Sequence, residues 1–152
     1  MNQQPVPPRR LAELPSWLLS RAAGVGAGIV GAALAAHGMR RQHFSVLHAL
    51  AEQGSVSQAE LGRRLGIDRS DLHTVLGDLE ASALIVRTPD PRDLRRNAVA
   101  ITPLGEEALG ELDRAIDGAQ QTLLAPLDDA ERAELARLLV LLLGDSAPTP
   151  DD

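Results

Sequence analysis

Apolar side chains recur three or four residues apart along most of this chain, which is the spacing of a helix with one buried face. From the N-terminus, the pattern predicts a long first helix over residues 11–38 and a second over 40–53, which Gly54 ends. In the C-terminal third, the same spacing predicts helices over 103–124 and 128–143. Four predicted helices therefore flank a central segment with a different pattern.

The central segment begins with two short helices. Ser57 and Glu60 have the spacing of a capping box, in which two side chains bind the free amides at a helix start. That helix ends at Gly66, which suits the left-handed conformation found at helix ends, and Asp68 caps the next helix. Two short helices so close together form either a helix-turn-helix or a plain helical hairpin, and this spacing fits both equally.

Two strand-like runs follow, at residues 84–87 and 98–102. The ten residues between them, TPDPRDLRRN, combine loop-forming Pro and Asp with three arginines. The segment is therefore predicted to be a β-hairpin with a basic tip, which favours the helix-turn-helix over the helical hairpin. Thr102 and Pro103 have the identities typical of an N-cap and the first position of the helix that comes next.

Three stretches resemble the MarR family of winged helix-turn-helix regulators. They are SQAELGRRLGIDRSDLHTVLGDLEASALIVR, the wing-like DPRDLRRNAVAIT, and TPLGEEALGELD. The resemblance extends over residues 11–143. It implies a mainly α fold with a small β-hairpin wing, six helices and an intertwined homodimer. It places dimerisation helices at 11–38 and 103–143 and the winged helix-turn-helix at about 40–102, while 1–10 and 144–152 are expected to be a disordered arm and tail.

The resemblance also implies that the recognition helix enters the major groove of double-stranded DNA and the wing enters the minor groove, on a pseudo-palindromic operator. Thr74, Ala83 and Leu94 depart from residues common in the family, so we expect binding to depend mainly on wing and phosphate contacts. The implied DNA-binding residues are Ser57, Gln58, Arg69, Ser70, Asp71, His73, Thr74, Arg92, Arg95 and Arg96.

In the resembled family, small effectors bind in a cleft between the first, second and fifth helices. An aromatic or phenolic acid would suit this chain, because Trp17 offers a flat apolar surface and Arg21 lies one turn later to bind an acidic group. The alternative is that Trp17 belongs to a dimer core and Arg21 to a surface ion pair. The implied effector-binding residues are Trp17, Arg21, His37, His43, Phe44 and His48.

The last predicted helix ends in LARLLVLLLG, which is apolar on nearly all sides. Such a surface is larger than a monomer usually exposes, so we expect a second copy of the chain to cover it. Burial under the first helix of the same chain is the alternative. The expected dimer-interface residues are Leu11, Leu14, Leu18, Leu135, Leu138, Leu139 and Leu142.

Composition excludes several other classes of function. The chain has no Cys, and its four His residues do not form a recognisable ligand motif, so we expect no metal, no cofactor and no enzymatic activity. The net charge is −6, but it is uneven: residues 1–60 carry +2, residues 61–102 carry +1 and residues 103–152 carry −9. An acidic C-terminal part therefore follows a neutral-to-basic middle, and the net charge as a whole does not indicate nucleic-acid binding.

The stretch GVGAGIVGAALAAHG, residues 24–38, matches motifs for a dinucleotide loop, a membrane helix contact and a signal-peptidase site. A helical pattern precedes it where a dinucleotide fold needs a strand. The run is dominated by Ala and Gly, and Trp17 and Arg21 interrupt any signal sequence. We expect it to form the C-terminal half of the first helix, in a cytoplasmic, nucleoid-associated protein with no membrane partner.

These patterns predict a sequence-specific, DNA-binding transcriptional regulator, specifically a repressor relieved by a small aromatic or phenolic effector. Two alternatives stay open. The chain is either a winged-helix module for protein interaction without DNA readout, or a DNA-binding regulator without an effector.

Overall fold

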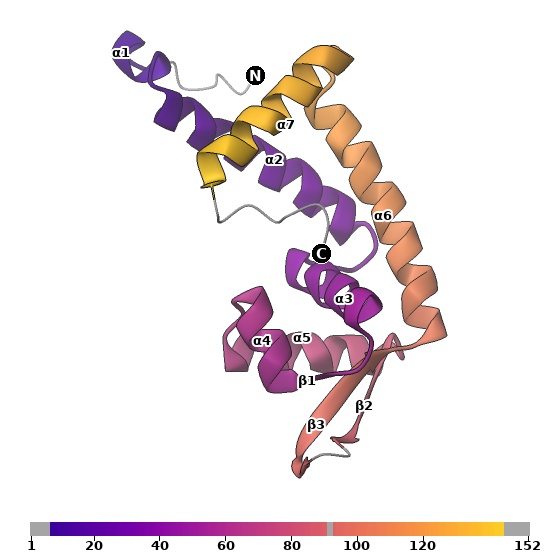
Figure 1. The fold of residues 1–152 in the computed structure, drawn as a ribbon. Helices are drawn as coiled ribbons and strands as arrows, with labels where there is room; N and C mark the ends of the chain where they lie inside the picture. Colours follow the sequence, from indigo (N-terminus) through magenta and orange to yellow (C-terminus); the bar gives the residue numbers. More distant parts are fainter. Residues whose placement is uncertain (1–6, 91–92, 145–152) are drawn as a thin grey trace.

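The computed structural model describes residues 7–90 and 93–144, with the backbone alone described at 90 and over 93–96. Seven helices and three short strands lie in this part of the chain (Figure 1). In chain order they are α1 (Arg9–Ala12), α2 (Pro15–Ala35), α3 (Arg41–Gln53), β1 (Val56–Ser57), α4 (Gln58–Leu65), α5 (Arg69–Ala81), β2 (Ile85–Asp90), β3 (Asp93–Ile101), α6 (Pro103–Leu123) and α7 (Asp129–Leu143).

The predicted first helix is two helices, so the expected number of six was too small by one. Pro15 is the first residue of α2, and the backbone of Leu14 before it is extended, with φ −83° and ψ 122°. The proline ring disfavours helical geometry at the preceding residue, which separates α1 from α2. Arg9 and Arg10 belong to α1, so the expected disordered arm is too long at its C-terminal end.

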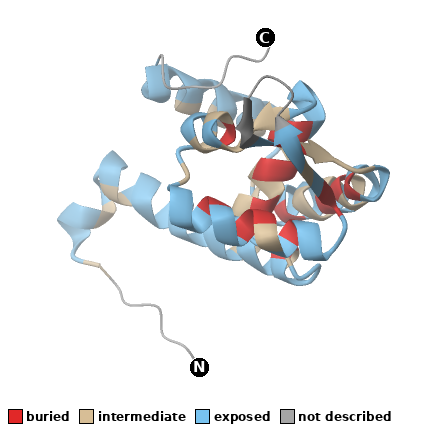
Figure 2. Ribbon diagram, turned by 90° about the horizontal axis from the view of Figure 1, so that it is seen from below, coloured by how far each residue is buried: buried red, intermediate tan, exposed pale blue. Residues whose placement is uncertain are grey.

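The elements form two lobes that share α6. The winged-helix lobe contains α3, α4, α5 and the three-stranded sheet, and the helical lobe contains α1, α2 and α7 (Figure 1). The long helix α6 begins beside the sheet and packs against both α3 and α2 along its length. Figure 2 shows that the buried residues concentrate in the winged-helix lobe.

The helix-turn-helix has the predicted ends. The Asp68 side chain accepts hydrogen bonds from the amides of Ser70 and Asp71, and Gly66 ends α4 with a φ of +61°. The predicted capping box at Ser57 is half formed. Its hydroxyl accepts from the Glu60 amide at 3.2 Å, but the Glu60 carboxylate binds arginines of its own helix instead.

The sheet differs from the prediction in two ways. A third strand, β1, pairs antiparallel with β3 and gives the strand order β1-β3-β2. The hairpin strands also run much farther than expected, because β2 reaches Asp90 and β3 begins at Asp93, with an irregularity in pairing after Pro89. Most of the segment predicted as a loop therefore lies in the two strands.

The two C-terminal helices begin as predicted. Thr102 caps α6 by accepting from the Gly105 amide at 3.0 Å, and Pro103 is its first residue. Asp128 and Glu131 form both hydrogen bonds of a capping box at the start of α7. These local signals position the connection between α6 and α7, but α7 makes only sparse contacts with the other described elements.

Candidate nucleic-acid interface

A surface groove of about 720 Å³ runs along the outer side of the helix-turn-helix. We call it the HTH groove. Ser57 and Gln58 line it at the start of α4, Arg69 at the start of α5, and Asn97 on β3. Arg63 of α4 also lines it, and 70% of its side chain is exposed. The groove thus combines helix N-termini and cationic groups, which attract phosphate, with the carboxylate of Asp68, which binds two amides at the start of α5.

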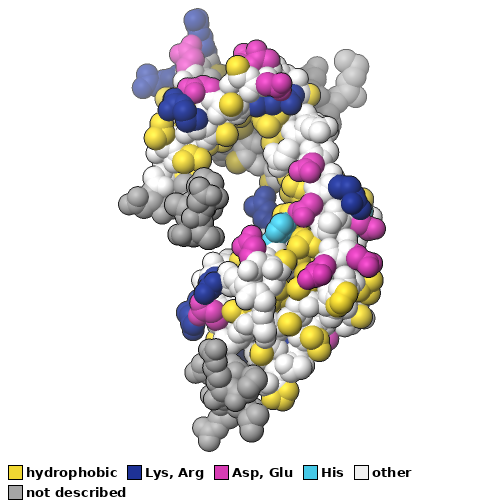
Figure 3. Space-filling view, turned by 45° about the vertical axis from the view of Figure 1, so that its right-hand side comes forward, with side chains coloured by type: hydrophobic (Ala, Val, Ile, Leu, Met, Phe, Trp, Pro, Cys, Tyr) yellow, Lys and Arg dark blue, Asp and Glu magenta, His cyan; other side chains and the backbone are white. Residues whose placement is uncertain are grey.

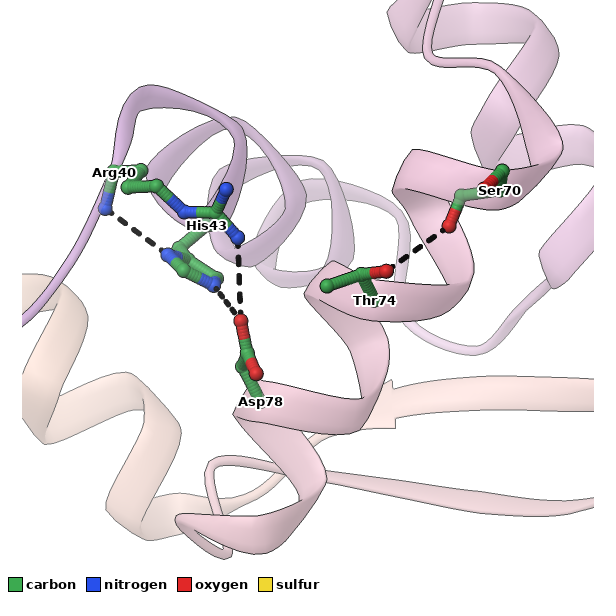
Figure 4. A network of polar contacts seen from close by, with 5 residues as sticks. All are labelled: Arg40, His43, Ser70, Thr74 and Asp78. Atoms are coloured by element: carbon green, nitrogen blue, oxygen red, sulfur yellow. Dashed lines mark hydrogen bonds and ion pairs between the residues drawn. The ribbon is translucent and has the colours of Figure 1, made fainter.

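The recognition helix α5 presents a polar face to solvent. Its apolar face is buried in the core, while Ser70, Asp71, His73 and Thr74 are exposed near its N-terminal end. The Thr74 hydroxyl donates to the Ser70 carbonyl at 3.2 Å, so this hydroxyl already has an acceptor within the helix (Figure 4). The exposed turns offer short polar side chains and no Arg or Lys beyond Arg69.

Two arginines of α4 are paired with Glu60. Arg64 donates from Nε at 2.7 Å, and Arg63 binds the other carboxylate oxygen. The hydrogen bond from Arg64 is the main cause that lowers the pKa of Glu60 below its ordinary value. Because these side chains are largely exposed, the pairs contribute little to stability and remain available to exchange for phosphate.

The base of the wing is attached to α5. Arg87 of β2 donates to the Glu80 carboxylate, which lowers the pKa of Glu80, and this pair links the strand to the recognition helix. The predicted wing residues Arg95 and Arg96 lie on β3 rather than in a loop, and their side chains are outside the described part. Arg92 also lies outside the described residues.

The turn between α5 and β2 has the backbone geometry of a glycine turn although it contains alanine. Ala83 has a φ of +58°, and among the described residues it is the one non-glycine with a positive φ. Its amide donates to the Glu80 carbonyl at 2.9 Å, and its carbonyl accepts from the Thr102 hydroxyl at 2.7 Å. Ala83 in place of a glycine therefore keeps this turn, but its backbone conformation costs free energy.

Within one chain, the six residues predicted to line an effector cleft lie in two separate places. The Arg21 guanidinium lies 5.3 Å from the centre of the Trp17 ring, near the start of α2. His37 follows the other end of that helix, about 30 Å away at 1.5 Å per residue. Within one chain, α2 therefore holds Trp17 and Arg21 apart from His37, and the effector-binding role of the six residues stays a prediction.

The predicted effector residues of α3 have partners inside the fold. The His43 side chain is buried and bonded to Asp78 of α5, as Figure 4 shows. His48 bonds to Asp113 of α6 at 2.7 Å, and the Phe44 ring meets the His48 ring edge-on at 4.6 Å. Asp78 and Asp113 are 35 and 65 residues distant from their partners, so local sequence patterns did not reveal these pairs.

The predicted dimer residues lie on the surface of the single chain. Leu11, Leu14 and Leu18 are exposed, and on α7 Leu142 is 70% exposed. Leu138 is also exposed, whereas Leu135 and Leu139 are half-buried. Figure 3 shows hydrophobic side chains on the surface of the helical lobe, which is separated by a gap from the lobe below.

Helix α2 has one more notable property. It is long and apolar enough to cross a membrane by length and composition only, with a mean hydropathy of 1.6 over an 18-residue window, of which 11% is buried. Of its glycines, Gly26 faces Leu123 of α6, where an added Cβ would lie 3.3 Å from a methyl group. Gly24, Gly28 and Gly31 face open space.

Among the described residues, no group of three His, Cys, Asp or Glu side chains is placed to hold a metal.

Known proteins with similar sequences and structures identify the family of this chain. The sequence model of the MarR family matches residues 37–96, which include all of α3, α4 and α5 and most of the hairpin. The chain belongs to the MarR family. Its members in these comparisons are transcriptional regulators and not enzymes, in agreement with the expectation from sequence.

Three MarR-type relatives define the similarity. A Thauera aromatica protein, named for transcriptional regulation of the hcr operon, is 36% identical over 70% of this chain, which spans only 64% of that relative's length. A Pseudomonas aeruginosa probable transcriptional regulator is 29% identical with a TM-score of 0.75, covering 88% of this chain and 99% of its own. Bordetella bronchiseptica BpsR, whose DNA binding is described as regulated by 6-hydroxynicotinic acid, is 27% identical with a TM-score of 0.74, covering 90% and 97%.

Proposed function

We propose that this MarR-family chain is a homodimeric transcriptional regulator that binds double-stranded DNA. The observation that carries the proposal is the HTH groove, in which the starts of α4 and α5 and the strand β3 converge with Arg63 and Arg69. A recognition helix flanked by phosphate-binding groups is what major-groove binding requires. Ser70, Asp71, His73 and Thr74 then face the bases, and Arg92, Arg95 and Arg96 reach the minor groove from the wing.

The dimer is part of this proposal. The exposed leucines of α1, α2 and α7 form an apolar surface that water does not favour, and a second copy would cover it. Two recognition helices related by a two-fold axis read half-sites about one helical turn apart. The operator is therefore proposed to be pseudo-palindromic, and the protein to work in the cytoplasm, on the nucleoid.

We further propose that the protein is a repressor released by an aromatic or phenolic acid. BpsR, which has a similar fold, is described as responding to 6-hydroxynicotinic acid, an acid of this class. The paired Trp17 and Arg21 supply a flat ring and a cation beside it. Since these two are distant from α3 in one chain, the site would have to be completed by the partner subunit.

A gel-shift titration tests the DNA-binding proposal. Duplex from the region upstream of the protein's own gene is titrated at several salt concentrations, with Arg95→Ala and Arg96→Ala compared with Arg114→Ala on α6. Loss of a phosphate contact should reduce the slope of log affinity against log salt by about one. Arg114 is exposed and distant from the HTH groove, so its replacement should leave binding unchanged.

The salt dependence also tests the second candidate, a winged-helix module that binds protein alone. The net charge of −6 and the acidic residues of α5 favour that alternative. A wild-type protein with no salt-dependent shift, on this duplex or on any duplex from a randomised library, would overturn DNA binding and leave the protein-binding module as the remaining candidate. For the effector, a panel of aromatic acids should raise the melting temperature and release DNA. If no acid in the panel has either effect, the alternative of a regulator without an effector is favoured.

A further inference from the structure

Three side chains meet where α3 passes over the second half of the recognition helix. They are Arg40, just before α3, His43 in its first turn, and Asp78 of α5 (Figure 4). We call them the α3–α5 clamp. One Asp78 oxygen, Oδ2, lies 3.1 Å from His43 Nε2 and 3.2 Å from Arg40 Nη2. A single carboxylate oxygen of the recognition helix therefore binds two groups from the segment that follows α2.

The imidazole of His43 is oriented by a second bond. Its Nδ1 accepts from the backbone amide of Arg40 at 3.0 Å. Since Nδ1 is an acceptor, the neutral ring carries its proton on Nε2 and donates it to Asp78. Only 4% of the His43 side chain is exposed, so the ring has little freedom to turn away. A buried donor of this kind depends on its acceptor, because water does not replace a lost partner.

The position of the clamp gives it a connection to both lobes. Arg40 follows the turn that ends α2, where the Met39 amide donates to the Leu34 carbonyl at 3.0 Å. Leu34 is fully buried in the core, whereas the rest of α2 lies in the helical lobe. Asp78 lies two turns after Ser70 and one after Thr74, both on the exposed side of the same helix. The clamp thus joins the end of the dimerisation helix to the helix that faces DNA.

We propose that Asp78 is a positioning residue, held by His43 and Arg40, which sets the recognition helix against the α2–α3 connection. This inference rests on the proposed DNA binding. In this arrangement the negative charge of Asp78 is retained on α5, although it weakens attraction for phosphate, because the clamp needs a carboxylate there. A shift at the end of α2 then reaches the DNA-facing turns through bonded side chains and not through the apolar core alone.

The test compares two variants that each remove one negative charge. Asp78→Ala removes a negative charge from the DNA-binding lobe, and so does Glu52→Ala, at an exposed residue of α3 with no side-chain bond among the described residues. Through charge alone, both variants should bind DNA more tightly. If Asp78 positions the helix, Asp78→Ala instead loses affinity for the tightest duplex selected from a randomised library, by about fivefold or more, and keeps its affinity for bulk genomic duplex.

Two variants of His43 separate positioning from general stability. Gln places an amide N–H near the position of Nε2, so His43→Gln should keep the preference for the selected duplex. His43→Leu fills the space without a donor and should lose that preference. The core variant Val75→Ala on α5 destabilises the lobe without touching the clamp, and it shows how much preference is lost through lower stability alone.

Amide hydrogen exchange on the free protein gives a readout that needs no DNA. Asp78→Ala should speed exchange within α5 and around Arg40, with the middle of α6 unchanged. Tight binding of the selected duplex by Asp78→Ala, equal to that of Glu52→Ala, overturns the proposal. If the wild-type protein selects no duplex, the proposed function fails, and the exchange result then decides the positioning role: unchanged exchange in α5 overturns it and faster exchange supports it.

Discussion

In the winged-helix lobe, the apolar side chains of α3, α4 and α5 meet in one core, whereas those of α2 and α7 mostly face outward. Leu47, Leu50, Leu61 and Leu76 are fully buried, but Leu141 and Leu142 are 64% and 70% exposed. Both lobes are rich in leucine, so composition does not explain the difference. One lobe is complete within a single chain, and the other has the surface of a structure that needs a partner.

Charged variants of α7 should have the largest effect. Leu138→Glu combined with Leu142→Glu should convert a dimer into monomers, because each leucine buried in an interface stabilises it by about 1.5–3 kcal/mol. Together they predict a dimer dissociation constant at least about 100-fold weaker. Analytical ultracentrifugation measures this. Leu104→Glu, at a half-exposed leucine on α6, is the matched control, and equal dimerisation of all three proteins would remove the distinction between the lobes.

The second-largest effect is expected when one methyl group is added inside the winged-helix lobe. At Gly105 an added Cβ would overlap the Leu84 carbonyl oxygen and crowd Ile101, and both belong to well-packed backbone or core. Gly105→Ala should lower the free energy of unfolding by about 1–3 kcal/mol. Gly110→Ala, on the same helix but facing open space, should raise it slightly. Urea unfolding of the two variants decides whether this lobe is as tightly packed as its burial indicates.

At the glycines of α2, an added methyl group should have the opposite effect and stabilise the helix in one chain. Gly28 and Gly31 face open space in one chain, so Gly28→Ala should stabilise the helix by up to about 1 kcal/mol in an isolated chain. If a partner helix crosses at these glycines, the same change should weaken the dimer. Thermal melts at two widely different protein concentrations separate these effects, and a gain at both would mean that no close crossing exists there.

The turn after the recognition helix should respond favourably to a substitution. Ala83 holds a φ of +58°, which costs an L-residue about 1 kcal/mol and a glycine almost nothing. Ala83→Gly should therefore raise the unfolding free energy, less the extra entropy that glycine has in the unfolded chain. A lower melting temperature for the glycine variant would show that the strain at Ala83 is smaller than the entropy cost of glycine.

The smallest effect should be a change in how folding stability depends on acidic pH. The bond from Arg87 lowers the pKa of Glu80 from its ordinary value of 4.5. A lowered folded-state pKa means that the stabilisation is present above that ordinary value and is lost as pH falls through the folded pKa. Glu80→Gln should therefore show a weaker loss of stability with falling pH below about 4.5 than the wild-type protein. Parallel pH dependence in the two proteins would mean that the pair does not link the wing to α5.

Local signals in the sequence predicted much of the fold. The caps at Asp68, Thr102 and Asp128 are short-range hydrogen bonds between neighbours, so their positions follow from residue identity. The proline at position 15 is an equally local signal for the break between α1 and α2, but the apolar spacing continues across it and hides the break. Strand β1 has only two residues, too few to show a period of two.

The site was harder to predict because its contacts join distant parts of the chain. The Pro and Asp residues of 88–97 are typical of loops, yet pairing with β3 extends β2 to Asp90. His43 has no neighbour in sequence that reveals Asp78 as its acceptor. Trp17 and His37 were grouped by resemblance, although a rigid helix separates them. The helix caps at Asp68, Thr102 and Asp128 were confirmed, whereas the pairings that join distant parts of the chain needed the structure.

The hydroxyl of Thr102 joins three elements of the winged-helix lobe. It donates to the Ala83 carbonyl after the recognition helix and accepts from the Gly105 amide at the start of α6, and it directly follows the wing strand β3. From this pivot α6 extends 21 residues, about 30 Å, toward α7. Such a helix acts as a lever: a tilt of about 5° at the pivot moves its far end by about 3 Å. In the proposed dimer, such a lever would make the spacing of the two winged-helix lobes sensitive to small rearrangements where the α6 helices of the two chains meet.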